Sequence, residues 1–186
     1  MKKYELTSET KVFLGKTLYR IKALVQFGNV NAGDLGGWIE KEENLSQYGN
    51  AWVYGNAVVS GNARVYGNAV VYGNAVVDGN ARVYGNAEVY GNAEVSGNAR
   101  VSGNAEVCKI GTVFWIGAIG SRNGTTTFFR CKDGKIYVSC GCFLGDLEEF
   151  SDKVKQTHGD NEHGRVYMLA IEMAKARIVE EKNEVH

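Results

Sequence analysis

The segment YGNAVVYGNAVVDGNARVYGNAEVYGNAEV, residues 66–95, repeats one six-residue unit five times. The tripeptide Gly-Asn-Ala recurs ten times at this period, from Gly49 to Ala105, and such a short, strict period indicates a repeat architecture. In each unit, Ala and Val alternate with two variable residues, as inward and outward positions alternate along a strand. Gly-Asn is a turn pair that tolerates left-handed backbone. Because six residues cannot form a hairpin strand and its return, the chain must turn a corner after every unit.

This pattern resembles the hexapeptide repeat of left-handed parallel β-helices, in which three hexads, 18 residues in all, form one triangular coil. The strict match covers residues 49–107. We therefore expect a mainly β protein: a left-handed parallel β-helix with an N-terminal β cap and a small C-terminal α+β unit. The expected domains are residues 1–28 for the cap, 29–112 for the β-helix and 113–186 for the α+β unit.

The constant letters of the repeat predict a solid core. With 18 residues per coil, the inward valines stack in three columns, and alanines fill the corners. A core packed this uniformly leaves no internal cavity, so any ligand must bind outside. The three predicted columns are Val53, Val71, Val89 and Val107; Val59, Val77 and Val95; and Val65, Val83 and Val101.

The variable letters place arginines and tyrosines together on one outward face. Guanidinium groups bind phosphate and tyrosines stack on bases, so this face is a candidate site for a nucleotide or another anionic small molecule. The alternative is that the arginines extend into solvent and lean on the tyrosines through cation–π contacts. Arg122, in the polar loop of residues 121–124, is a further candidate, with a simple Asn-Gly turn as its alternative. The candidate ligand-binding residues are Arg64, Tyr66, Arg82, Tyr84, Arg100 and Arg122.

Apolar outward residues gather in the first coils, and an exposed apolar patch usually marks an interface. Proteins of the hexapeptide-repeat family commonly form parallel trimers, so the resemblance implies a homo-oligomer, with a trimer favoured. The alternative is that the chain's own N- or C-terminal segment covers the patch. The candidate interface residues are Trp52, Tyr54, Val58, Val70, Tyr72 and Val76.

The N-terminal segment is expected to cap the β-helix, because an uncovered coil end exposes strand edges. Residues 18–27 alternate like a strand that forms a hairpin with residues 12–14, and an irregular first coil follows from Asn31. The combination of LVQFGNVNAGDLGGWIE with LSQYGNAWVYGNA resembles uncharacterised β-helix proteins of phages and prophages, which are often labelled transferase-like on the repeat alone. That resemblance implies a viral or prophage origin.

The C-terminal segment predicts three strands and two helices. Asp146 is expected to cap the first helix and Asp160 or Asn161 the second, which should run to near the C-terminus and pack through one apolar stripe. Two cysteines and two histidines, Cys140, Cys142, His158 and His163, are residue types that could ligate a zinc ion. However, no paired C-x-x-C motif supports it, so neither a metal nor a cofactor is expected. The predicted stripe is Val166, Leu169, Ala170, Met173 and Ala174.

The composition limits the kinds of partner that the protein can bind and the cellular compartment in which we expect it. The chain has 21 basic and 21 acidic residues, so its net charge is zero and bulk DNA binding is not expected. Four cysteines are too few for a disulfide scaffold, and no stretch is apolar enough to cross a membrane. We expect a protein of the bacterial host cytoplasm.

Hexapeptide-repeat acyltransferases use a histidine as general base and a loop that leaves a coil, whereas the ten repeats here contain neither. The sequence therefore favours a non-enzymatic phage or prophage binding protein. It could antagonise bacterial immunity by sequestering a nucleotide signal or by inhibiting a host defence protein. The alternatives are a hexapeptide-repeat acyl- or nucleotidyltransferase and a virion fibre protein.

Overall fold

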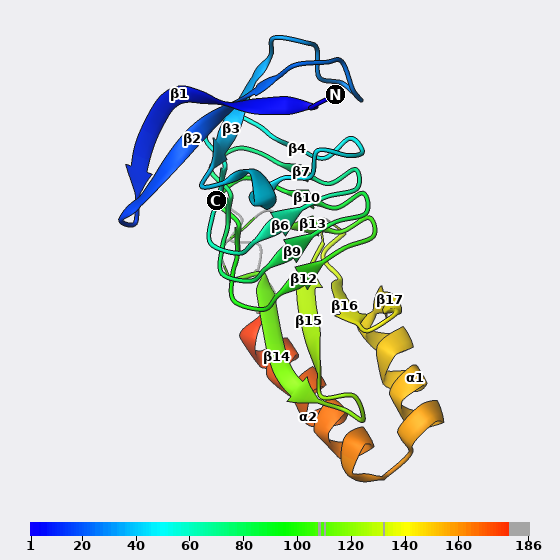
Figure 1. Ribbon diagram of the computed structural model, residues 1–186. Helices are drawn as coiled ribbons and strands as arrows, with labels where there is room; N and C mark the ends of the chain where they lie inside the picture. The colour runs from blue at the N-terminus through cyan, green and yellow to red at the C-terminus, as the bar shows by residue number, and fades with distance from the viewer. Residues whose placement is uncertain (108, 110, 132, 179–186) are drawn as a thin grey trace, which may run out of the picture.

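The structure is a computed structural model that describes residues 1–107, 109, 111–131 and 133–178. It comprises an N-terminal hairpin, a β-solenoid and a C-terminal unit of strands and helices, stacked along one axis (Figure 1). The hairpin strands are β1 (Tyr4–Phe13) and β2 (Lys16–Ala23), followed by β3 (Leu35–Ile39) and the 3₁₀ turn η1 (Glu42–Asn44).

The solenoid is the predicted hexapeptide-repeat left-handed β-helix. Its ten two-residue strands lie in three sheets, and within each sheet they pair in parallel with the equivalent strand 18 residues away, as Val53 pairs with Val71. Every valine of the three predicted columns is fully buried, which confirms the solid core. The ten strands are β4 (Trp52–Val53), β5 (Val58–Val59), β6 (Arg64–Val65), β7 (Val70–Val71), β8 (Val76–Val77), β9 (Arg82–Val83), β10 (Glu88–Val89), β11 (Glu94–Val95), β12 (Arg100–Val101) and β13 (Glu106–Val107).

The corners explain why Gly-Asn never varies. Gly67 has φ +73°, and a methyl group on it would lie 3.1 Å from the Gly85 nitrogen in the next coil. The asparagines form ladders along the corners, in which the Asn68 amide donates to the Asn86 Oδ1 at 3.0 Å. The positive φ of the corners therefore favours glycine, the close approach of the next coil adds a steric reason at corners such as Gly67, and the asparagine that follows both donates and accepts.

The N-terminal segment caps the upper coil, as predicted. Strand β2 pairs with β3 and so extends one solenoid sheet, although β2 ends at Ala23, four residues earlier than the sequence indicates. Lys3 Nζ donates to the Ala51 carbonyl at 2.8 Å, and the Tyr4 hydroxyl donates to the Leu45 carbonyl at 2.7 Å. These side chains satisfy backbone groups that a missing coil would otherwise bond.

The C-terminal unit covers the lower coil (Figure 1). The Arg100 N–H donates to the Thr127 Oγ1 at 2.9 Å, and Phe129 is buried among the solenoid valines. The sheet has four strands rather than the predicted three, because the segment before the first helix also pairs. The elements are β14 (Val113–Ile119), β15 (Gly124–Arg130), β16 (Ile136–Cys140), β17 (Phe143–Asp146), α1 (Leu147–His158) and α2 (Glu162–Arg177).

The two helices begin where the sequence predicts, with Asp146 and Asn161 as their N-caps. The predicted apolar stripe of α2 is partly wrong, because Leu169 and Met173 are 65% and 52% exposed. The helix carries apolar residues on two faces, and the face that packs on the sheet is lined by Tyr167, Ala170, Ile171 and Ala174. The predicted extension of this helix falls on residues 179–186, outside the described residues.

In the part of the chain that the structure describes, no helix combines the length and the apolar character that crossing a bilayer requires.

Candidate functional site

The predicted arginine column exists in the structure. Arg64, Arg82 and Arg100 are in-register neighbours on β6, β9 and β12, which places their backbones ~4.8 Å apart. The side chains of Arg64 and Arg82 are exposed. Among the described residues, none of the three forms an ion pair, and the cation–π contacts involve other cations. The column therefore presents uncompensated positive charge to solvent.

The tyrosines form a second column beside the arginines. The rings of Tyr66 and Tyr84 stack in parallel with centroids 5.0 Å apart and an interplanar angle of 1°. Partial burial raises the pKa of Tyr66, while the charges of Arg82, Arg100 and Arg64 act in the opposite direction. The two columns are thus close enough to act on one ligand.

A surface hollow of about 610 Å³ lies at the upper end of both columns. Arg64, Arg82 and Tyr66 line it from the solenoid, whereas Tyr84 and Arg100 continue the columns below it. The rest of the lining comes from η1 and the loop after it, where Leu45 pairs with Val65 as the next strand position above it. The residues of this part of the lining are Glu42, Glu43, Leu45, Ser46, Gln47 and Tyr48.

The acidic side of the hollow is partly neutralised. Glu42 Oε1 forms an ion pair with Lys2 Nζ at 2.6 Å, while Glu43 is exposed. The lining is thus basic where the solenoid strands form it and weakly acidic where η1 forms it, which suits a ligand that is anionic at one end and carries hydroxyl groups at the other.

Arg122 does not belong to this site. It is exposed in the turn between β14 and β15, which lies at the end of the molecule away from the N-terminal cap (Figure 1). The Asn123 N–H donates to the Gly120 carbonyl at 3.1 Å, and Asn123 has φ +46°. The loop is a tight hairpin turn, the alternative that the sequence left open.

Two of the predicted interface residues are buried within the chain. Trp52 is 1% exposed and its ring meets those of Tyr4 and Phe27 at 6.0 and 5.3 Å. Val58 is 3% exposed and packs with Leu18. Their expected exposure is therefore corrected: the N-terminal segment folds over the first coils and removes this apolar surface from water.

The other four predicted interface residues, Tyr54, Val70, Tyr72 and Val76, are half-buried. Tyr72 stacks on Tyr90 at 4.9 Å, and its hydroxyl donates to the Glu88 carboxylate at 3.2 Å. Burial and this hydrogen bond raise the pKa of Tyr72 to about 12. The outward apolar patch is accordingly smaller than the sequence suggests.

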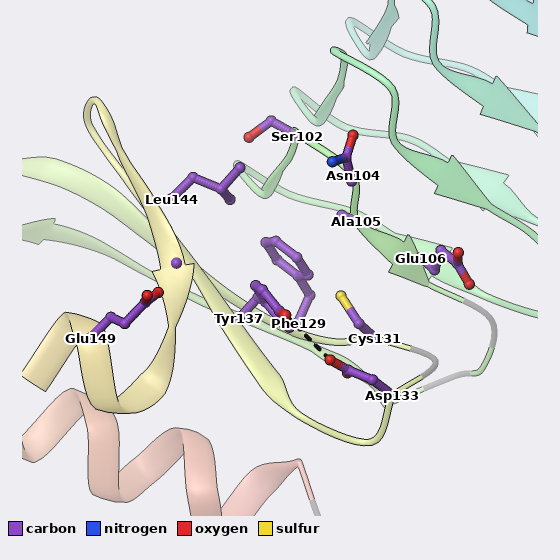
Figure 2. A pocket seen from close by; sticks show the side chains of 11 residues that line it. Ser102, Asn104, Ala105, Glu106, Phe129, Cys131, Asp133, Tyr137, Leu144 and Glu149 are labelled. Atoms are coloured by element: carbon purple, nitrogen blue, oxygen red, sulfur yellow. Dashed lines mark hydrogen bonds between the residues drawn. The ribbon is translucent and has the colours of Figure 1, made fainter.

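A second hollow, of about 490 Å³, lies between the lowest coil and the C-terminal unit (Figure 2). Phe129 and Tyr137 line it, and carboxylates surround it. The Tyr137 hydroxyl donates to the Asp133 carboxylate at 3.2 Å, and Glu149 accepts from the Asp146 N–H at 2.9 Å as part of the α1 cap. Because Asp133 and Glu149 already accept hydrogen bonds from the protein itself, they are less available to a ligand. This hollow is therefore the weaker candidate site.

The cysteine and histidine set does not form a metal centre. The Thr126 hydroxyl donates to Cys140 Sγ at 3.2 Å, and the rings of His158 and His163 meet edge-on at 5.8 Å. Across residues 1–178, outside the gaps at 108, 110 and 132, no three His, Cys, Asp or Glu side chains could together hold an ion.

Comparison with known proteins finds similarity in the solenoid. The family model described as YdcK beta solenoid repeat matches residues 63–79. The protein named "Uncharacterized acetyltransferase YdcK" from Escherichia coli (strain K12) is 38% identical in an alignment of 61 positions, and the match covers 28% of this chain and 19% of that protein. The chain thus matches about a fifth of the length of this curated relative. The comparisons support the repeat architecture, and the word acetyltransferase belongs to the relative's name.

Proposed function

We propose that this protein is a non-enzymatic binding protein that holds an anionic small molecule on the arginine and tyrosine columns. The observation that carries the proposal is the in-register stack of Arg64, Arg82 and Arg100 without a carboxylate partner among the described residues. Neighbouring guanidinium groups repel by ~1 kcal/mol per pair in a water-like dielectric, and by more where water is excluded. An anion between them replaces that repulsion with charge-assisted hydrogen bonds.

The surroundings of the column favour a ligand bound on the outside of the solenoid. The core is filled by valine and alanine, so the inside offers no space. The hollow beside Arg64 and Arg82 is about 610 Å³, within the range of roughly 300–1,000 Å³ typical of small-molecule sites. Since the arginines project from paired strands, little backbone ordering is needed on binding.

The test is calorimetric titration with pyrophosphate and with linear and cyclic nucleotides. Arg82→Glu is expected to abolish binding, because it places a negative charge in the centre of the column. The coil tolerates this residue, since Glu88 and Glu94 occupy equivalent outward positions. Arg122→Glu makes the same charge change at the far turn and is the matched control. Unchanged binding in Arg82→Glu would refute the proposal.

The resemblance to phage and prophage proteins supports a biological setting for this binding. In an infected bacterial cytoplasm, a protein that sequesters a nucleotide signal would weaken host immunity, and so would one that inhibits a defence protein. Recovery of the bound nucleotide intact after denaturation of the complex is the result expected of a protein that sequesters its ligand. A homo-oligomer, with a trimer favoured, would multiply the number of columns per particle.

An acyl- or nucleotidyltransferase is the second candidate function, favoured by the name of the E. coli relative. A transferase needs a general base next to the acceptor, and the repeat that carries the arginine column contains no histidine. Incubation with acetyl-CoA and a panel of amines and alcohols separates the two functions. Loss of the thioester above the rate of a buffer control would favour the transferase.

A further inference from the structure

The tyrosine column stops where the solenoid changes period. In the regular coils, equivalent residues are 18 apart, but Ile39 pairs with Val59 and Leu45 with Val65, both twenty apart. The regular spacing resumes at Trp52, which pairs with Val70. Two extra residues therefore lie between Leu45 and Trp52, in the loop that forms one wall of the upper hollow.

These extra residues leave a gap in the stack of rings. The Ser46 N–H donates to the Val65 carbonyl at 2.9 Å, as the Tyr66 N–H donates to the Val83 carbonyl at 3.0 Å. Ser46 thus takes the place above Tyr66 that a third tyrosine would otherwise occupy. The nearest tyrosine in the chain, Tyr48, is 85% exposed. Its ring has no aromatic neighbour within the part of the chain that the structure describes.

We propose that the hollow binds a mononucleotide whose base fills this gap, stacked on Tyr66 and covered by Tyr48, with its phosphate on Arg64 and Arg82. The inference deepens the proposed function, and it rests on it. Tyr66 and Tyr84 already stack, so a base on the free side of Tyr66 continues an existing column. Base–aromatic stacking is tolerant of sequence because every base has a π face.

The charges of the hollow point to a single phosphate. Arg64 and Arg82 supply two positive charges to the lining, and Glu42 and Glu43 supply two carboxylates. A triphosphate carries more negative charge than the two arginines neutralise, and the exposed Glu43 carboxylate would repel the excess, because only Glu42 is paired with Lys2. A ribose, by contrast, can donate its hydroxyl protons to either carboxylate. A monophosphate is therefore favoured over a triphosphate.

The experiment compares ligands that lack one part each. AMP, GMP, CMP and UMP are titrated into the full chain by calorimetry, together with ATP, ribose 5-phosphate and adenosine. At least one mononucleotide is expected to bind at least tenfold more tightly than ribose 5-phosphate, because base stacking adds to the phosphate contact. ATP is expected to bind more weakly than AMP.

Variants then locate the base. Tyr48→Ala is expected to weaken mononucleotide binding about tenfold and to leave ribose 5-phosphate unaffected, whereas Tyr48→Phe retains the ring and the affinity. Tyr48 is exposed, so neither change threatens folding. Tyr90→Ala removes a ring from the stack on the other face and is the matched control.

The possible outcomes distinguish failure of the base site from failure of the proposed anion-binding function. If mononucleotides and ribose 5-phosphate bind equally, or Tyr48→Ala binds as the wild type does, the base site is refuted while the anion column stands. If no phosphate-bearing ligand binds, or Arg82→Glu changes nothing, both the base site and the proposed function are refuted.

Discussion

The regular coils and the first coil are built from the same kind of chain and differ by two residues. In the regular coils, Val71, Val77 and Val83 are fully buried and every corner repeats the one before it. In the first coil, the spacing between paired residues rises from eighteen to twenty. The chain leaves the solenoid surface there and forms one wall of a hollow.

The difference indicates that strict repetition builds a regular wall, and that the two hollows lie where the period breaks or ends. Both hollows described above lie at ends of the solenoid, one against the loop at Ser46 and one against the C-terminal sheet. The regular coils present columns of identical charged groups and aromatic rings, and the irregular ends form the hollows in which a ligand can be enclosed. A ligand site needs both, which is why the upper end is the stronger candidate.

The largest expected effect tests the irregular end. Trp52→Ala should lower the free energy of unfolding by about 3–5 kcal/mol, because it leaves a cavity under Tyr4 and Phe27. Urea denaturation measures the change, and Trp52→Phe, which retains a ring, should cost clearly less. If Trp52→Ala costs under about 1 kcal/mol, the N-terminal segment does not hold the first coil as the structure indicates.

The next effect compares the loss of stability at two corners, one that packs against the next coil and one with no atom within 4 Å of an added methyl group. Gly85 has φ +71°, and a methyl group on it would lie 2.9 Å from the Gly103 nitrogen, whereas Gly55 has φ +58° and nothing within 4 Å. Both alanine variants pay backbone strain of about 1–2 kcal/mol. Gly85→Ala should lose about 1–3 kcal/mol more, because the coils must separate. Equal losses in the two variants would show that the coils do not limit the choice of residue.

The same comparison explains what the sequence could and could not predict. The valine columns and the corners follow from the strict six-residue period. Once one strand is placed in register, the positions of all the equivalent residues are known. Alternation assigned Trp52 and Val58 to outward positions, but it carries no information on which distant segment covers them. The position of Tyr48 depends on the path of two inserted residues, and no repeat specifies that path. Helix α2 carries apolar residues on two faces, so the sequence does not show which face packs on the sheet. In the structure Tyr167 and Ile171 are buried there, whereas Leu169 and Met173 are exposed.

The smallest expected effect is a pH dependence at the cap. Burial lowers the pKa of Lys3 to about 8, from 10.5 in an ordinary environment. The folded protein thus releases this proton at a lower pH than the unfolded chain does. Between about pH 8 and 10.5 the unfolded state binds more protons, so the Lys3 contribution to stability must rise with pH.

Lys3→Met removes this titration and retains an apolar stem over Phe27, which Lys3 Nζ approaches to 4.7 Å from the ring centroid. The difference in unfolding free energy, wild type minus Lys3→Met, should therefore be constant below about pH 7 and shift in favour of the wild type by pH 9.5. Other lysines and tyrosines titrate in both proteins and cancel in the difference. A difference that stays flat up to pH 9.5 would mean that Lys3 remains hydrated, and that the upper end of the solenoid is less tightly closed than its hydrogen bonds to Ala51 and Gly49 imply.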